Sequence, residues 1–183
     1  AVFEMSEDCK IHKQWFGRTV IHSDRRFAYE EAQEVIETGK GDFAEEITTL
    51  DRLAKQLRAD RFKKGSINFH SLEVKFKLNE KGEPLGVFIK EQKDANKMIE
   101  DFMLLANRKV AEFIGNPPKG KKVKPFVYRI HDNPDPEKLQ TFSEFIKKFG
   151  YRIDTTSPRG ISNSLNKLMS TIEGKAEEQL ISQ

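Results

Sequence analysis

The chain has 183 residues, of which 33% are charged and 37% hydrophobic, so it can form one sizeable core and has the composition of an ordinary globular domain. Its formal net charge of +3 is too small for a protein that binds nucleic acid by charge alone. It has no apolar run long enough to span a membrane. Cys9 is the only cysteine, which excludes an internal disulfide and makes the reducing cytoplasm the expected location.

The first third of the chain predicts two strands and two helices. Residues 1–5 alternate between apolar and polar side chains, and residues 15–23 are rich in aromatic and β-branched side chains, so both are predicted strands. A helix is expected at residues 29–38 and is ended by Gly39. A longer helix is expected at residues 43–61, where leucine, isoleucine and alanine recur at helical spacing.

The middle third predicts a hairpin and a long helix. Residues 69–78 and 85–91 read as two strands around the turn sequence N-E-K-G-E, in which Gly82 supplies the positive φ that such a turn needs. The long helix is expected at residues 95–114, with Asp94 as its N-cap.

The last third predicts one more strand and three helices. The strand is expected at residues 126–130, and the helices at residues 135–149, 161–170 and 174–183. No internal repeat or low-complexity linker interrupts the chain. We therefore expect an α+β fold, with a mixed or antiparallel sheet and several packed helices, that forms one unit over residues 1–183.

Spacing alone gives no catalytic site. The four histidines are scattered and lack the spacing of metal ligands. The glycines do not form a phosphate-binding loop, and no serine lies in a nucleophile elbow. Any candidate site must therefore come from residues that suit binding rather than from a catalytic motif.

Phe69 is the first candidate, because it lies at the start of a predicted strand between Asn68 and His70. An aromatic ring in this position suits stacking on a nucleic-acid base, which contributes about 1–3 kcal/mol per base and tolerates any sequence. The alternative is a core phenylalanine, since most of the 14 phenylalanines must be buried.

Glu100 is the second candidate. It lies about 20° from Asn107 on the helical wheel, with Asn96 close by. A carboxylate and two amides in a row could exchange hydrogen bonds with ribose hydroxyls, and the 2′-OH distinguishes RNA from DNA. Asp101 falls on the same predicted polar side. The alternative is an ordinary solvated helix face.

Arg25, Arg26 and Tyr29 form a third group, at the start of the first helix. The cations could hold phosphates and the ring could stack on a base. The alternative is an exposed helix start without a ligand.

Four blocks of the sequence, in this order, resemble the middle of the RNB catalytic domain of the ribonuclease R and ribonuclease II family. They are S-D-R-R-F-A-Y-E-E-A-Q, L-R-A-D-R-F-K-K-G-S-I-N-F-H-S-L-E-V-K-F, N-K-M-I-E-D-F-M-L-L-A-N-R-K-V-A and P-F-V-Y-R-I-H-D-N-P-D-P-E-K-L. Together they cover most of residues 23–139, with a looser likeness on either side.

The resemblance implies a processive exoribonuclease that degrades single-stranded RNA from its 3′ end and releases nucleoside monophosphates. It implies that Phe69 stacks on the 3′-terminal bases and that Glu100 contacts the RNA near the cut. Arg26 and Tyr29 match a recurring pair of the R-x-x-Y block. The resemblance implies no small-molecule cofactor besides magnesium, and no membrane partner.

The departures from the family pattern concern the chemistry. The aspartate cluster that binds magnesium in the family is expected upstream of Ala1, and nothing in the chain matches it. The S-P-I-R-R-Y block is expected downstream, and S-P-R-G at Ser157 is not that block. Asn96 replaces the usual histidine, and Asp101 the second glutamate, of the L-I-E-E motif.

We therefore expect an internal fragment of a magnesium-dependent exoribonuclease that is inactive by itself. Ala1 is not a methionine, and the chain starts as a strand already under way, which agrees with this view. Two alternatives stay open. One is a non-catalytic RNA-binding module, a degenerate relative, and the other is a protein-interaction module that uses the hairpin and the long helix.

Overall fold

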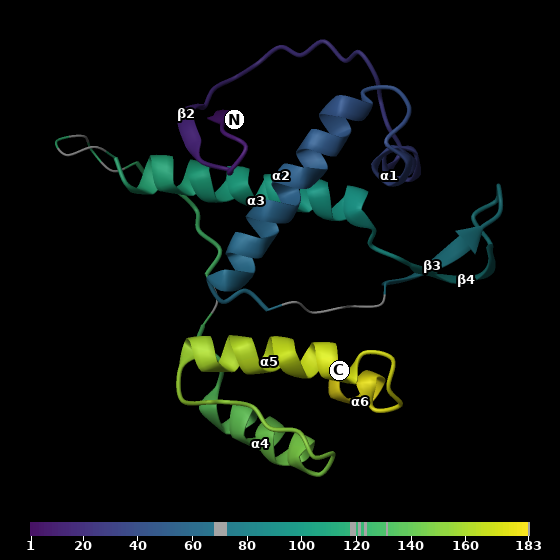
Figure 1. Ribbon diagram of the computed structural model, residues 1–183, viewed down its shortest axis with the longest axis vertical. Helices are drawn as coiled ribbons and strands as arrows, with labels where there is room; N and C mark the ends of the chain where they lie inside the picture. Colours follow the sequence, from purple (N-terminus) through teal and green to yellow (C-terminus); the bar gives the residue numbers. More distant parts are fainter. Residues whose placement is uncertain (68–72, 118–119, 121, 123, 131, 183) are drawn as a thin grey trace. The chain divides into compact units, whose positions relative to one another are not determined.

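The computed structural model of the 183-residue chain describes all residues except 68–72, 118–119, 121, 123, 131 and 183 (Figure 1). It combines helices with two small antiparallel sheets, which confirms the predicted α+β class. Its contacts divide the chain into two compact units, the first formed by Ala1–Ala59 with Gln92–Arg129 and the second by Asp60–Glu91 with Ile130–Gln183. The single unit expected for residues 1–183 stays a prediction. In the described part of the chain, no helix is both long and apolar enough to cross a bilayer.

The first unit opens with an antiparallel pair of strands, β1 (Val2–Met5) and β2 (Ile11–Trp15). The second strand therefore lies earlier than the predicted residues 15–23. A tight turn explains the difference: the N–H of Ser6 donates to the carbonyl of Lys10 at 2.9 Å, so pairing resumes at Ile11. Residues 16–23 follow without regular structure.

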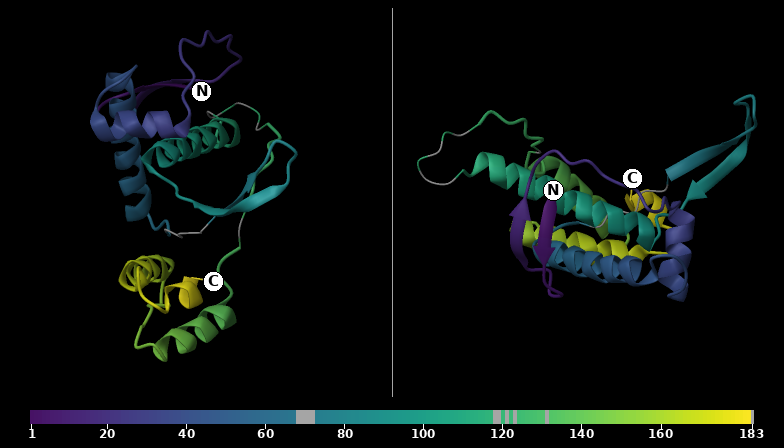
Figure 2. Two further views of the ribbon diagram at one scale, coloured as in Figure 1. Left: turned by 90° about the vertical axis from the view of Figure 1, so that its right-hand side faces the viewer. Right: turned by 90° about the horizontal axis from the view of Figure 1, so that it is seen from above.

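Three helices complete the first unit. They are α1 (Tyr29–Thr38), most of α2 (Ala44–Lys63) and α3 (Asp94–Gly115). Helix α2 crosses α3 in the view of Figure 1, and Figure 2 shows the same helices from two further directions. Helix α1 begins and ends where the sequence predicts, because residues next to each end set its bounds. The N–H of Ala28 donates to a Glu31 carboxylate oxygen at 2.8 Å, and Gly39 ends the helix at φ 67°.

Fewer apolar side chains of helix α3 are buried than its helical periodicity predicts. Its buried residues are Ala95, Met98, Asp101 and Leu105. Asp101, expected on the polar side, is only 4% exposed, whereas Ile99 is 42% exposed. Asp94 is the first residue of the helix rather than its cap, and the carbonyl oxygen of the Asn96 side chain accepts from the N–H of Lys93 at 3.2 Å instead.

The second unit contains a hairpin of β3 (Glu73–Leu78) and β4 (Pro84–Lys90), with Gly82 at φ 80° in its turn as predicted. The register places its apolar side chains on one face, because Val74 pairs with Ile89 and Phe76 with Val87. All four of these side chains are more than half exposed. Neither strand of the hairpin has a third strand beside it among the described residues.

The rest of the second unit is helical. Helix α4 (Pro136–Lys147), capped by Asp135, packs with α5 (Pro158–Ile172) and α6 (Glu178–Ser182). Their shared core contains Ile146, Leu168, Ile172 and Ile181. The strand predicted at 126–130 is absent: these described residues, of which Ile130 is the first of the second unit's later segment, carry no regular structure.

Candidate nucleic-acid interface

Glu100 projects from the exposed side of α3, and so does Asn107 two turns further on. Seven residues at about 1.5 Å each separate them by roughly 10 Å along the helix axis, which is longer than one nucleotide step. Asn96, the third member of the predicted row, is half-buried and uses its carbonyl oxygen as the helix cap described above. The exposed polar row on α3 is therefore formed by Glu100 and Asn107.

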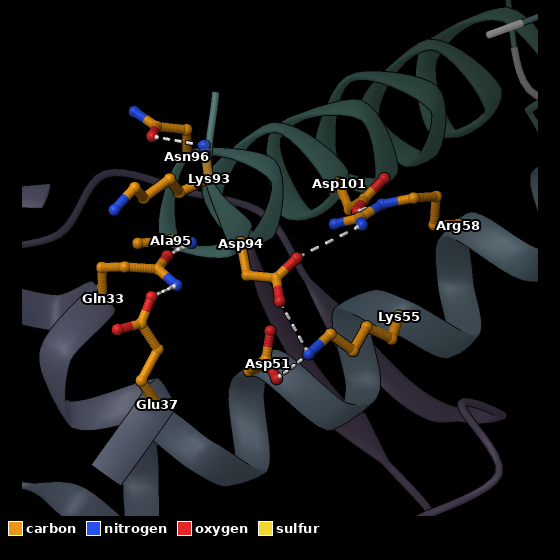
Figure 3. A network of polar contacts seen from close by, with 10 residues as sticks. All are labelled: Gln33, Glu37, Asp51, Lys55, Arg58, Lys93, Asp94, Ala95, Asn96 and Asp101. Atoms are coloured by element: carbon orange, nitrogen blue, oxygen red, sulfur yellow. Dashed lines mark hydrogen bonds and ion pairs between the residues drawn. The ribbon is translucent and has the colours of Figure 1, made fainter. Parts of the chain in front are cut away.

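The opposite side of α3 is held by a network of charges that joins it to α2 (Figure 3). Nε of Arg58 donates to Oδ2 of Asp101 at 2.9 Å, and an Nη atom of Arg58 lies 3.9 Å from Oδ1 of Asp94. Nζ of Lys55 lies 2.8 Å from Oδ2 of Asp51 and 3.0 Å from Oδ2 of Asp94. These two carboxylates, Asp51 first, raise the pKa of Lys55 above its ordinary value. The network fixes the axial position of α3, and with it that of Glu100.

A buried amide joins α1 to the start of α3 in the same unit (Figure 3). The N–H of Ala95 donates to Oε1 of Gln33 at 2.9 Å, and Nε2 of Gln33 donates to a carboxylate oxygen of Glu37 at 2.8 Å. Gln33 is buried, so both ends of its amide are used inside the protein. Sequence reasoning had no signal for this link, because a glutamine on a helix is usually exposed.

Tyr29 and Arg26 lie at the start of α1, where both are exposed. Arg25, their neighbour, has a structural role: Nη2 contacts Glu31 at 3.1 Å, Nε contacts Asp42 at 3.3 Å, and its guanidinium lies over the ring of Phe27. The Ala28 N–H, and secondly Arg25, lower the pKa of Glu31 below its ordinary value. The side chain of Arg25 is therefore held by contacts within the protein, whereas that of Arg26 is exposed to solvent.

Phe69 lies outside the described residues, so its role as a stacking residue stays a sequence prediction. Arg26, Tyr29 and Glu100 all belong to the first unit, in which Gln33 ties α1 to α3. Phe69 belongs by its position to the second unit.

The residues present do not fit a magnesium site. No group of three or more histidine, cysteine, aspartate or glutamate side chains is placed to hold a metal within the described ranges. Asp51, Asp94 and Asp101 are paired with Lys55 and Arg58 where α2 and α3 meet. The negative charges of these aspartates are balanced by the two cations at the contact between α2 and α3. The described residues therefore offer no metal-dependent step.

Comparison with known proteins identifies the family. The sequence profile described as "RNB domain" matches residues 1–183. The chain belongs to the RNB domain family. This membership agrees with the resemblance in the four sequence blocks, and it extends that resemblance to both ends of the chain.

Curated relatives of this RNB-domain chain include exonucleases from several kingdoms. It is 38% identical to "DIS3-like exonuclease 2" of Schizosaccharomyces pombe over 92% of this chain and 19% of that protein. It is 29% identical to "Ribonuclease R 1" of Lactococcus lactis, over 99% of this chain and 22% of that protein. It is 27% identical to "Inactive exonuclease DIS3L2" of Arabidopsis thaliana, over 94% and 17% of the two chains. The chain therefore spans about a fifth of the length of the relatives it matches.

Solved structures agree on the fold. The chain matches the apo form of Mycoplasma genitalium RNase R with a TM-score of 0.80 at 20% identity, over 98% of this chain and 28% of that one. The same RNase R in complex with ribose methylated single-stranded RNA matches with a TM-score of 0.70 at 21% identity, over 86% and 24% of the two chains. At these identities the likeness establishes the fold of this part of the RNB domain.

Proposed function

We propose that this chain is an RNA-holding part of an exoribonuclease that degrades single-stranded RNA processively from its 3′ end to nucleoside monophosphates. The observation that carries the proposal is the match of the RNB domain over all 183 residues. The relatives named as exonucleases support the activity, and the RNase R complex with single-stranded RNA supports the substrate class.

In this proposal the first unit contributes the surface on α3 and α1. The carboxylate of Glu100 accepts a hydrogen bond from a ribose 2′-OH, which would make the site selective for RNA. Arg26 binds a backbone phosphate, and the ring of Tyr29 stacks or packs beside it. From the second unit, Phe69 stacks on a base near the 3′ end.

Magnesium dependence and cytoplasmic location are also part of the proposal. Magnesium would activate the attacking water and stabilise the leaving oxygen, and its ligands would belong to parts of the protein outside these 183 residues. The chain alone would then bind RNA weakly and leave it uncut.

A non-catalytic RNA-binding module is the second candidate. The observation that favours it is the similarity to the Arabidopsis relative named as inactive. Such a protein would keep the RNA-holding surface on α3 but would not shorten the RNA.

The deciding experiment compares the full-length protein with the isolated 183-residue chain. Each is incubated with 5′-labelled single-stranded RNA and magnesium, and the products are resolved at single-nucleotide resolution. We expect stepwise 3′ shortening by the full-length protein only. Binding without shortening would establish the second candidate. Shortening by the isolated chain that persists through further purification would contradict our account of its missing metal site.

A further inference from the structure

Gln33 is the buried residue through which α1 holds the first turn of α3 (Figure 3). Gln33 is 7% exposed, and Ala95, whose N–H donates to Oε1 of Gln33 at 2.9 Å, is 1% exposed. The first N–H groups of a helix have no partner within that helix, and a buried N–H without a partner is costly. Gln33 supplies this partner from another helix, so the hydrogen bond fixes the start of α3 relative to α1.

Glu37 holds the amide of Gln33 in the orientation that this contact needs. Nε2 of Gln33 donates to a carboxylate oxygen of Glu37, one turn later on α1, at 2.8 Å. An amide rotated by 180° would turn its NH₂ group toward the N–H of Ala95 and its oxygen toward the carboxylate, and both hydrogen bonds would be lost. The link from α1 to α3 is therefore supported from both ends of the amide.

The backbone around Arg26, the candidate phosphate contact, is held within its own element. Nη1 of Arg25 donates to the carbonyl oxygen of Arg26 at 3.2 Å. The N–H of Ala28 donates to a carboxylate oxygen of Glu31 on α1 at 2.8 Å. The position of Arg26 therefore follows that of α1.

Both candidate contacts lie within two helical turns of the hydrogen bond between Gln33 and Ala95. Glu100 follows Ala95 by five residues, about 7.5 Å along the axis of α3. Tyr29, at the start of α1, precedes Gln33 by four residues, about 6 Å along the axis of α1. All of these residues belong to the first unit. The distance between the two contacts is therefore set where α1 meets the start of α3.

We propose that Gln33 is a positioning residue that fixes the spacing between the phosphate contact of Arg26 and the ribose contact of Glu100, a proposal that rests on the function proposed above. Gln33 is buried and does not touch the RNA, so its effect must pass through these two residues. An RNA held at one contact presents its neighbouring nucleotides to the other at a local concentration set by the distance between the contacts. A fixed spacing makes the two contacts cooperative, and a loosened spacing makes them independent.

The test uses variants of the full-length protein. Gln33→Met keeps the length of the side chain and removes the acceptor of the Ala95 N–H. Gln140→Met on α4 is the matched control, because Gln140 is exposed and its Nε2 also donates to a glutamate four residues later, Glu144, at 3.1 Å. The rescue variant exchanges two residues, Gln33→Glu with Glu37→Gln, which keeps an acceptor for the Ala95 N–H and a hydrogen bond between positions 33 and 37. Gln33→Ala, which leaves room for a water at that N–H, replaces Gln33→Met should the latter not fold.

The measured quantity is the Kd for a short 5′-labelled oligouridylate in EDTA, so that RNA is bound and not shortened. Arg26→Ala and Glu100→Gln are made alone and together, first in the wild-type background and then in Gln33→Met. Each Kd is calculated from the concentration of binding-competent protein, which is found by titration with RNA well above the Kd. Partial unfolding therefore cannot mimic a change of affinity.

We expect Arg26→Ala and Glu100→Gln each to raise the Kd of the wild type about three- to tenfold, the range for one lost contact. Because the two contacts cooperate, the double variant should raise the Kd less than the product of the single effects. Gln33→Met alone should raise the Kd about three- to tenfold, and in this background the two effects should multiply. Gln140→Met should behave as the wild type, and the exchange variant should restore the cooperation.

Two results would overturn the proposal alone. A lower Tm for Gln33→Met, with the wild-type Kd and the wild-type cooperation between Arg26 and Glu100, would make Gln33 purely structural. Multiplied effects of Arg26→Ala and Glu100→Gln in the wild-type background would show that no fixed spacing joins these contacts.

Shortening of the same RNA in magnesium, measured in parallel, separates this proposal from the proposed function. A wild type that shortens RNA, with a Kd that neither Arg26→Ala nor Glu100→Gln changes, would remove the positioned contacts while the activity stands. A wild type that binds RNA without shortening it, and keeps the cooperation, would overturn the activity and support the role of Gln33. A wild type that neither binds nor shortens RNA would overturn both.

Discussion

Arg58 on α2 and Asp101 on α3 form a buried ion pair, in which Nε of the guanidinium donates to Oδ2 of the carboxylate at 2.9 Å. The Asp101 side chain is 2% exposed and that of Arg58 18% exposed. A buried carboxylate is tolerated only with a partner. This pair therefore explains why an aspartate occupies the buried side of α3.

Removing Arg58 alone should destabilise the protein strongly. We expect Arg58→Met to lower the free energy of unfolding by about 3–5 kcal/mol, the range for breaking a buried ion pair by removing one partner, because Asp101 then loses its guanidinium contact. The double variant Arg58→Met, Asp101→Leu should be more stable than Arg58→Met. Urea unfolding of each variant measures the effect, with the exposed Lys63→Met as control, for which we expect a change within about 0.5 kcal/mol. Equal stability of Arg58→Met and wild type would show that the pair does not hold α3.

This pair also marks the limit of the sequence analysis. The wheel of α3 placed Glu100 on the exposed side correctly, because helical periodicity is a local property. It placed Asp101 there too, since a wheel carries no information on Arg58, which is 43 residues away. Similarly, α1 was predicted at Tyr29–Thr38 because Gly39 ends it locally.

Elements that depend on partners were predicted less well. Strand β2 was expected too late, because strand propensity alone does not reveal where a tight turn lets pairing resume. Residues 126–130 have the composition of a strand but carry none in the structure. Two hydrogen bonds had no signal in the sequence: the one between Gln33 and the N–H of Ala95, and the one between Asn166 and the carbonyl of Ser66. In each case a single amide side chain on a helix does not reveal its partner.

Substitutions of Arg25 and Arg26 should have different effects, the first on stability and the second on RNA binding. Arg25→Ala removes two exposed ion pairs and the contact with the Phe27 ring, so we expect a loss of stability of about 1 kcal/mol and unchanged RNA affinity. Arg26→Ala should leave the Tm unchanged, weaken RNA binding by the full-length protein, and reduce the slope of log affinity against log salt by about 1. Salt-dependent binding and thermal melting of both variants check this. An Arg26→Ala protein with the wild-type salt slope would remove Arg26 from the interface.

The start of α1 should weaken in acid. The Ala28 N–H and then Arg25 lower the pKa of Glu31 below its ordinary value of 4.5. A carboxyl group whose pKa is lower in the folded state stabilises the fold above its unfolded pKa, and this contribution is lost as the pH falls through the folded pKa. We therefore expect the protection of the Ala28 amide from hydrogen exchange, relative to the intrinsic rate at each pH, to decrease as the pH falls below about 4.5. Glu31→Gln should abolish this pH dependence; if the variant keeps it, another group is responsible.

Glu100 provides the most direct test of the central claim, which is that the exposed side of α3 contacts the ribose of RNA. Glu100→Gln keeps the shape of the side chain and removes its charge, and Glu100 is exposed, so the fold should be unaffected. The lost charge assistance should cost on the order of 1 kcal/mol, a several-fold effect on rate or affinity. Glu112→Gln, an exposed change on the same helix, is the control and should have no effect on cleavage.

The decisive measurement is single-turnover cleavage by the full-length protein of RNA substrates that each carry one 2′-deoxy position near the 3′ end. The account predicts that wild type and Glu112→Gln are slowed by 2′-deoxy substitution at one position, and that Glu100→Gln loses this sensitivity at that position while keeping its Tm. Identical profiles for wild type and Glu100→Gln across the whole series would contradict the account.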